Sequence, residues 1–152
     1  MRKPFAKEHF DYVFSFFTSF GYFDDHNENR AVIGNFSAAL KPGGVLMIDY
    51  LNAGYAAARL VLSEEREIDG IVYHITRWMD DRFFFKKILI DEKQMGAEIQ
   101  HTEQVAKLSL DHFVAMLNEH NLQLRQVYGD YELNDYDCTS SPRMIMVAQK
   151  QV

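Results

Sequence analysis

Asp49 lies near the carboxyl end of Val45–Leu51, an apolar run that predicts a buried strand. Ligands of open α/β sheets gather at the carboxyl ends of their strands, so this carboxylate is a candidate binding group. The alternative is a structural role, in which backbone donors of the next loop satisfy the carboxylate. Residue type and position leave both interpretations open.

A second polar group comes after an earlier apolar run. Ser15, Thr18 and Ser19 lie at its carboxyl end. The aromatic residues around them are Phe16, Phe17, Phe20, Tyr22 and Phe23. Aromatic residues with a few polar groups are typical of a pocket for an adenine or a small apolar substrate. The same cluster would also fit a plain hydrophobic core.

Other common chemistries have no signature in this sequence. It contains no Gly-x-Gly-x-x-Gly turn, Walker-type phosphate loop, paired cysteines or His-Glu-x-x-His helix. The six histidines are scattered, and His112 and His120 are too far apart on one predicted helix to share a metal ion. Cys138 has no His or Lys beside it, which favours an incidental loop thiol over a nucleophile. We therefore expect no metal site and name no catalytic residue.

The elements that must position these groups begin with an α/β pattern. Phe10–Phe17 is an almost continuous apolar run and predicts a central strand of a parallel sheet. Apolar residues at helical spacing predict a helix over Glu28–Leu40, which Lys41–Gly44 ends. Together with the strand Val45–Leu51, these elements form one βαβ unit.

The middle of the chain changes character. Ala53–Leu62 favours a short helix. Glu67–Met79, Arg82–Glu92 and Ala97–Lys107 have strand-like composition and are separated by turn residues. They predict a three-stranded antiparallel meander, inserted at residues 66–107.

The last part of the chain predicts a helix and a hairpin. Ser109 is a candidate N-cap for a helix that ends near Asn121. Leu122–Tyr128 and Arg143–Ala148 read as two strands, joined by a long polar loop.

Composition restricts the class of protein. The chain has 152 residues, of which 47% are hydrophobic, and this favours a single globular domain. Sixteen basic and 22 acidic residues give a net charge of -6, which argues against nucleic acid as a partner. No apolar run approaches the roughly 18 residues of a membrane-spanning helix. With one cysteine and no signal-peptide core, a cytoplasmic protein is expected.

Several motifs together resemble the second half of class I S-adenosylmethionine (SAM)-dependent methyltransferases. They are Phe10–Val13, Phe17–Phe23, Ala39–Gly44 and Ile48–Asp49, in this order and at this spacing. Farther on, the region 129–145 is similar to the closing hairpin of small bacterial methyltransferases that carry an inserted antiparallel lid. The resemblance implies an α/β fold, namely a partial Rossmann-like sheet with the family's fourth to seventh strands. Residues 1–152 would be one truncated methyltransferase-like domain, with the lid at 66–107.

The departure from the family lies at the front. The glycine-rich turn and the acidic strand ends that hold the cofactor have no counterpart before Phe10. At roughly 30 residues for each βα unit, three such units would take about 90 residues upstream. Met1–Phe5 resembles the segment directly after the family's third strand, so Met1 is interpreted as an internal methionine.

The resemblance also implies site residues. Contact with the SAM cofactor is carried over onto Met1, Arg2, Phe16, Phe17, Thr18 and Ser19. The pocket for a small-molecule methyl acceptor is carried over onto Asn52, Tyr55, Trp78, Glu103, Tyr131 and Arg143. Methyl transfer proceeds mainly by in-line positioning, so no dedicated base is required. Weak or absent SAM binding is expected for this chain alone.

A truncated sheet has a physical consequence. The strand 10–17 would become an apolar edge, and such edges promote pairing with other chains. We therefore expect a homodimer or another homo-oligomer with this strand at the interface. Three readings stay open: an enzyme fragment, a non-catalytic module that binds itself or a partner, and an unrelated α/β domain.

Overall fold

The computed structural model describes residues 3–4, 6–90, 96 and 99–152. The chain divides into two compact units, and each is described by itself. The first unit comprises Met1–Ala56 and Leu108–Val152, and the second comprises Ala57–Lys107. In the described part of the chain, no helix is long and apolar enough to cross a membrane.

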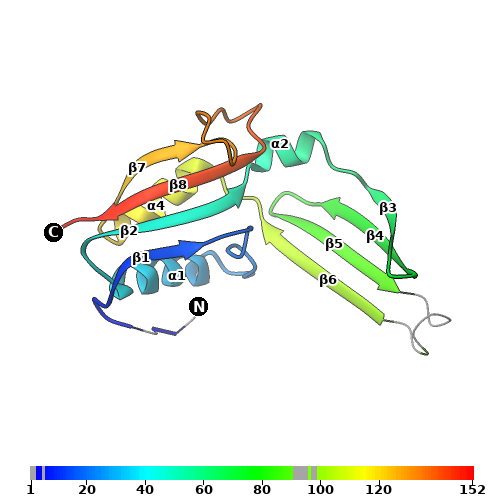
Figure 1. Ribbon diagram of the computed structural model, residues 1–152, viewed down its shortest axis with the longest axis horizontal. Coiled ribbons are helices and arrows are strands. Elements are labelled where there is room, and N and C mark those ends of the chain that lie inside the picture. The colour runs from blue at the N-terminus through cyan, green and yellow to red at the C-terminus, as the bar shows by residue number, and fades with distance from the viewer. Residues whose placement is uncertain (1–2, 5, 91–95, 97–98) are drawn as a thin grey trace. The chain divides into compact units, whose positions relative to one another are not determined.

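A mixed four-stranded sheet forms the centre of the first unit (Figure 1). Its strand order is β1 (Phe10–Ser15), β2 (Leu40–Leu51), β8 (Arg143–Lys150) and β7 (Leu122–Tyr128). β1 is parallel to β2, whereas β8 is antiparallel to both β2 and β7. The sequence therefore located all of these strands.

Two of the sequence predictions about this sheet need correction. The run at Phe10–Phe17 gives an edge strand, as expected for a truncated sheet, rather than the central strand that its apolar composition alone predicts, because no described strand pairs with its outer side. A continuous apolar run shows that a strand meets apolar surface, but it does not show how many neighbours pair with it. In addition, β2 begins at Leu40, because the Lys41–Gly44 stretch continues the strand through a register shift opposite β1.

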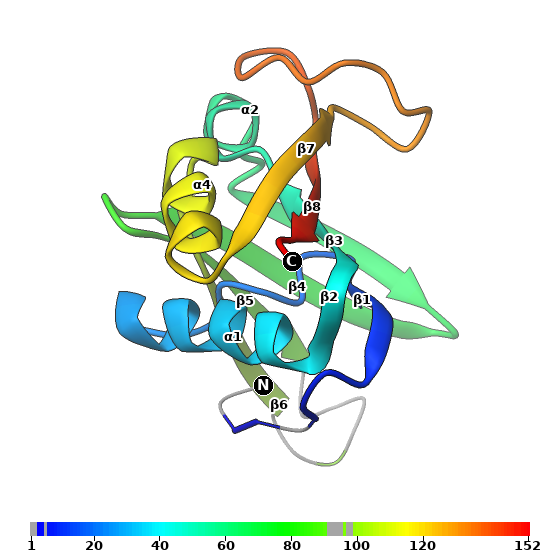
Figure 2. The same ribbon diagram turned by 90° about the vertical axis from the view of Figure 1, so that its left-hand side faces the viewer.

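Two helices pack against this sheet. α1 (His26–Ala39) begins after Asp25, whose side chain accepts a hydrogen bond from the Asn27 amide. α4 (Leu110–Glu119) begins after Ser109, the N-cap that the sequence predicted, and its first turn has a capping box. Figure 2 shows both helices on the same side of the sheet.

The core lies between these helices and the sheet. α1 contributes apolar residues at helical spacing, α4 contributes its own apolar side, and β2 contributes alternate residues. The largest fully buried side chains include Tyr50, Phe20, Phe113, Ile33, Leu46, Ile48 and Leu117. α2 (Ala53–Ala58) follows β2 and is shorter than the expected helix over Ala53–Leu62.

The second unit is a four-stranded antiparallel sheet in simple sequential order. Its strands are β3 (Ser63–Ile68), β4 (Ile71–Met79), β5 (Phe83–Ile90) and β6 (Ile99–Ala106). The three-stranded meander was therefore one strand short. The expected first strand, Glu67–Met79, is in fact the end of β3, a tight turn and β4.

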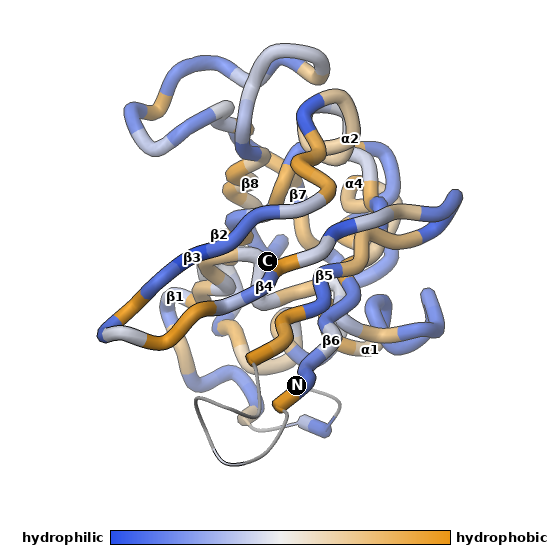
Figure 3. The backbone as a smooth tube through the Cα atoms, turned by 90° about the vertical axis from the view of Figure 1, so that its right-hand side faces the viewer, coloured by the Kyte–Doolittle hydropathy of each residue, from blue (hydrophilic) through white to orange (hydrophobic). Residues whose placement is uncertain are grey.

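The turn responsible is Asp69–Gly70. Both residues have positive φ, 52° and 80° respectively, as tight hairpin turns of the I′ type require. Asp-Gly is a strong hairpin signal, but the polar composition of β3 hid the strand before it. Figure 3 shows this contrast, with a hydrophilic β3 that becomes hydrophobic at its end and at the start of β4.

Candidate functional site

The candidate site lies at the edge of the mixed sheet that the strand ends form, and not along the side of the outer strand β1. The carboxyl ends of the parallel strands β1 and β2 meet there, and antiparallel β8 begins at the same edge. This arrangement brings together the turn Phe16–Ser19 after β1, Asp49 of β2 and Arg143 of β8. Tyr131, from the loop between β7 and β8, completes the cluster.

Asp49 is the centre of this cluster. Its side chain is 2% exposed and pairs with Arg143, with 2.8 Å from Nε and 2.6 Å from Nη2 to Oδ1. The other oxygen, Oδ2, accepts hydrogen bonds from the Phe17 amide at 2.9 Å and from the Tyr131 hydroxyl at 3.0 Å. The structural interpretation expected backbone donors of the loop after β2 to satisfy this carboxylate. A backbone donor does bind it, but that donor, the Phe17 amide, belongs to the loop after β1.

The turn after β1 is strained and firmly fixed. Phe17 and Thr18 have φ values of 56° and 55°, a left-handed conformation that costs a non-glycine residue about 1–3 kcal/mol. Two contacts hold Thr18: its amide donates to the Asp49 carbonyl at 3.1 Å, and its hydroxyl accepts from Arg143 Nη2 at 2.9 Å. The Asp49 carboxylate and carbonyl therefore both hold this turn.

The strained turn presents an aromatic side chain to solvent. Phe17 is 80% exposed, and Phe16 beside it is also exposed. The Ser19 hydroxyl, in the turn, lies 3.2 Å from the hydroxyl of Ser15, the last residue of β1. Solvent-exposed aromatic rings next to hydroxyl groups can stack on a planar ligand and donate hydrogen bonds to it.

Tyr131 covers Arg143. The guanidinium carbon lies 5.9 Å from the centre of the tyrosine ring. Partial desolvation raises the pKa of Tyr131, the hydrogen bond to Asp49 raises it further, and the Arg143 charge acts in the opposite direction. The phenol therefore stays protonated at neutral pH and serves as a hydrogen-bond donor.

The structure thus places six of the expected site residues together, namely Phe16, Phe17, Thr18, Ser19, Tyr131 and Arg143. Asn52 is buried at the end of β2, where its amide donates to the Cys138 carbonyl at 3.0 Å and to the Ser141 carbonyl at 2.8 Å. This side chain ties β2 to the loop before β8. A role in binding an acceptor would have to be additional to this structural one.

The remaining expected residues lie elsewhere. Tyr55 is in α2. Trp78 and Glu103 belong to the second unit, where Trp78 stacks on Phe85 at 5.2 Å and Glu103 pairs with Lys86 at 3.6 Å. Met1 and Arg2 lie outside the described residues. Cofactor or acceptor contact by any of these residues stays a prediction.

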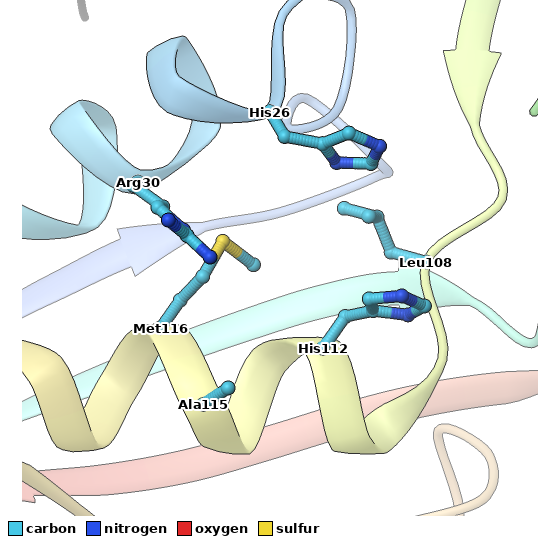
Figure 4. Close-up of a pocket in the computed structure, with 6 residues that line it drawn as sticks. All are labelled: His26, Arg30, Leu108, His112, Ala115 and Met116. Atoms are coloured by element: carbon cyan, nitrogen blue, oxygen red, sulfur yellow. The ribbon is translucent and has the colours of Figure 1, made fainter.

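A second feature is a hollow of about 300 Å³ between α1 and α4 (Figure 4). It is lined by His26, Arg30, Leu108, His112, Ala115 and Met116. The two imidazole rings are nearly parallel, at 14°, with centres 6.4 Å apart. Nδ1 of His112 accepts a hydrogen bond from the Ser109 amide at 3.1 Å, so this ring also caps α4.

Sequence reasoning missed this pair of histidines, because it compared His112 with His120 on the same helix. A usable signal was present, since His26 lies two residues before the predicted helix Glu28–Leu40 and His112 lies in the first turn of the helix predicted after Ser109. Among the residues described, no group of three or more His, Cys, Asp or Glu side chains is placed to hold a metal ion.

Comparisons with known proteins give a likeness of fold. No protein-family model and no curated protein matches the chain. Among solved structures, a SAM-dependent methyltransferase from Clostridium acetobutylicum superposes with a TM-score of 0.83 and 13% identity, covering 99% of this chain and 62% of that one. The CcbJ methyltransferase from Streptomyces caelestis superposes with a TM-score of 0.77 and 18% sequence identity, and the match covers 97% of this chain and 60% of that one.

A third structure is the SAM-bound amino pentose methyltransferase CalS10 from Micromonospora echinaspora. It superposes with a TM-score of 0.68 and 17% sequence identity, and the match covers 99% of this chain and 62% of that one. At these identities the likeness concerns the fold alone. The chain spans about 60% of the length of the structures it matches. It therefore has part of the fold seen in SAM-dependent methyltransferases.

Proposed function

We propose that this chain is the carboxyl-terminal part of a SAM-dependent methyltransferase that acts on a small molecule. One observation carries the proposal: the strained turn Phe16–Ser19, held by Asp49 and Arg143 at the carboxyl ends of two parallel strands. Strained, firmly held backbone is concentrated at functional sites, and open α/β sheets bind ligands at this edge. The partial methyltransferase fold supports the same reading.

The chemistry of the turn suits an adenosyl sulfonium ligand. Exposed aromatic rings attract both planar bases and cations through their faces, and Phe16 and Phe17 offer two such rings. The hydroxyls of Thr18 and Ser19 can bond to polar atoms of the adenosyl group. In the proposed complex this turn contacts the adenosyl part, and the rest of the cofactor is held by segments outside this chain.

The catalytic contribution of the chain is positional. Methyl transfer needs the acceptor atom, the methyl carbon and the sulfur in line, and correct positioning alone can lower the barrier by several kcal/mol, up to about 7–11. Tyr131 and Arg143, beside the turn, are the proposed acceptor contacts. Because the chain spans about 60% of the structures it matches, we propose that it is inactive alone.

A small-molecule acceptor is favoured by the structural neighbours. They include an amino pentose methyltransferase and a sugar N-methyltransferase. The alternative function is a non-catalytic module that binds itself or a partner. The apolar edge at β1 favours that alternative.

Titration with S-adenosylhomocysteine, followed by amide NMR spectra, tests the proposal on the chain as it stands. We expect shifts centred on Phe16–Ser19 at millimolar ligand and no measurable binding at micromolar ligand. Phe17→Ala removes an exposed ring and should abolish the shifts. The matched control Leu133→Ala, at an exposed loop position, should retain them.

Two results would contradict the proposed contact between this turn and the adenosyl group. The first is an absence of shifts throughout the spectrum when S-adenosylhomocysteine is present at its solubility limit. The second is a set of shifts confined to residues outside the sheet edge, such as those lining the hollow between α1 and α4.

A further inference from the structure

We propose that Tyr131 is a positioning residue for the turn Phe16–Ser19, and that Asp49 couples this turn to the loop between β7 and β8. The inference deepens the proposed function and rests on it only for the identity of the ligand that binds the turn. The coupling itself depends on contacts within the chain, in which one oxygen of Asp49 holds both the turn and the loop.

The carboxylate of Asp49 has no hydrogen-bonding capacity to spare. A carboxylate offers about four lone-pair sites, two on each oxygen. Arg143 occupies those of Oδ1, with Nε at 2.8 Å and Nη2 at 2.6 Å. The Phe17 amide at 2.9 Å and the Tyr131 hydroxyl at 3.0 Å occupy those of Oδ2. Asp49 therefore holds its neighbours in place and reaches no ligand unless one of these donors leaves.

Tyr131 is the donor that leaves at the lowest cost. Its hydroxyl is uncharged, and the residue lies in a loop and is 59% exposed. Arg143 carries a full charge and extends from β8 with 20% of its side chain exposed, and the Phe17 donor is a backbone group. Water replaces an exposed, neutral donor with a smaller loss than it replaces a buried, charged one. The bond between Tyr131 and Asp49 is thus the contact in this cluster that opens first.

While it is bonded, Tyr131 supports both contacts that hold the turn. It shares Oδ2 of Asp49 with the Phe17 amide, and its ring centre lies 5.9 Å from the guanidinium carbon of Arg143. Nη2 of Arg143 also donates to the Thr18 hydroxyl at 2.9 Å. A ring over the guanidinium excludes water, and electrostatic interactions are stronger where water is excluded. Opening of Tyr131 therefore weakens the attachments of Phe17 and Thr18 together.

The turn responds to this change because it is strained. Phe17 and Thr18 have left-handed φ values of 56° and 55°, and such backbone persists only while its surroundings hold it. The turn therefore has a held form and a relaxed form, and Tyr131 favours the held one. Coupling between two sites is reciprocal, so a ligand that stabilises the held turn also favours the bond between Tyr131 and Asp49. In the proposed enzyme, binding of the adenosyl group would thus order the loop that carries a proposed acceptor contact.

Amide hydrogen exchange on the free chain tests the coupling without a ligand. Tyr131→Phe removes the hydroxyl and keeps the ring over Arg143. The amides of Phe17 and Thr18 should exchange about tenfold faster, because a hydrogen bond to a charged group changes an opening equilibrium by about that factor or more. Amides in the centres of β2 and β8 should exchange at the wild-type rate, which also shows that the variant is folded.

Tyr136→Phe is the matched control. Tyr136 lies in the same loop between β7 and β8, and its hydroxyl is not one of the donors to Asp49. This variant should leave the exchange of the turn unchanged. If Tyr131→Phe accelerates exchange equally throughout the first unit, Tyr131 has only a structural role and the coupling is overturned. Unchanged exchange at Phe17 and Thr18 would overturn it as well.

Titration with S-adenosylhomocysteine separates the coupling from the proposed function. In the wild-type chain, amide shifts at the turn should be accompanied by shifts at residues 130–134 of the loop. In Tyr131→Phe the shifts at the turn should remain, and those of the loop should be lost. An absence of shifts at the turn in the wild type contradicts the proposed cofactor contact, and the exchange measurement then decides the coupling by itself. Loop shifts that persist in Tyr131→Phe overturn the coupling and leave the cofactor contact standing.

Discussion

Replacing Asp49 by Asn tests whether this carboxylate holds the sheet edge together. The carboxylate is nearly inaccessible, and it accepts hydrogen bonds from Arg143, the Phe17 amide and the Tyr131 hydroxyl. Asparagine has nearly the same shape but no charge, and its amide group points a donor at partners that are donors themselves. The substitution therefore leaves Arg143, whose side chain is 20% exposed, without its counter-charge.

The structure allows the size of the effect to be worked out. Removing one partner of a buried ion pair costs about 3–5 kcal/mol. Because water reaches part of Arg143, we expect the lower end of that range, about 3 kcal/mol. Domains of this size have a total unfolding free energy of about 5–15 kcal/mol, so the variant should fold but lose a substantial fraction of its stability.

Urea unfolding followed by amide NMR signals of β2 and β8 is the appropriate assay. The single tryptophan, Trp78, belongs to the second unit, so its fluorescence would not report on this sheet. Asp11→Asn provides the matched control. Asp11 forms an exposed pair with Lys41 at 2.9 Å, and such pairs contribute at most about 1 kcal/mol.

Two outcomes decide the question. If Asp49→Asn costs no more than Asp11→Asn, the cluster does not hold the turn and the reasoning is refuted. A double variant, Asp49→Leu with Arg143→Met, adds a second check. It should recover part of the lost stability, because an apolar pair carries no unpaired charge.

Further predictions concern other parts of the molecule. Asn29 is buried, and neither polar atom of its side-chain amide has a hydrogen-bond partner within the described structure. Asn29→Leu should therefore raise the unfolding free energy by about 1–3 kcal/mol in urea titrations. A lower unfolding free energy would show that the amide has a partner. Gly70 has a φ of 80°, so Gly70→Val should destabilise the second unit by about 1–3 kcal/mol, whereas Asp69→Asn should be nearly neutral. Unfolding followed by tryptophan fluorescence measures both changes. Equal effects of the two substitutions would count against the turn geometry. Hydrogen bonds from Thr139 and from its neighbour hold the pKa of Asp137 far below its ordinary value. The stability that this carboxylate contributes is therefore complete above about pH 3.9 and is lost only as the pH falls through the lower folded pKa. The amide shift of Thr139 should titrate well below pH 3.9, and a midpoint near that value would contradict the assignment.

Local patterns predicted most of the elements. The Ser109 cap and the apolar spacing after it gave α4, because capping and helical periodicity depend on neighbours within a few residues. β3 was missed for the same reason. It carries Glu64, Glu65, Arg66 and Glu67, so its composition resembles a loop, and its identity as a strand depends on pairing with β4.

The candidate site was predicted in part. Strand position indicated Asp49, and resemblance to a family indicated Thr18, Tyr131 and Arg143. The contacts among them could not be predicted, since Arg143 and Thr18 are 125 positions apart in the chain and meet only through the order of the strands. The positive φ values of Phe17 and Thr18 were likewise beyond prediction, because nothing in their residue types favours that conformation.

The central claim, that this chain is the carboxyl-terminal part of a SAM-dependent methyltransferase, is tested most directly by the source DNA upstream of the Met1 codon. Three βα units of roughly 30 residues each correspond to about 270 bases. Our account predicts an open, in-frame stretch of about this length that encodes a glycine-rich turn after a strand and acidic residues at later strand ends. An in-frame stop codon close to Met1, with unrelated sequence before it, would contradict the account.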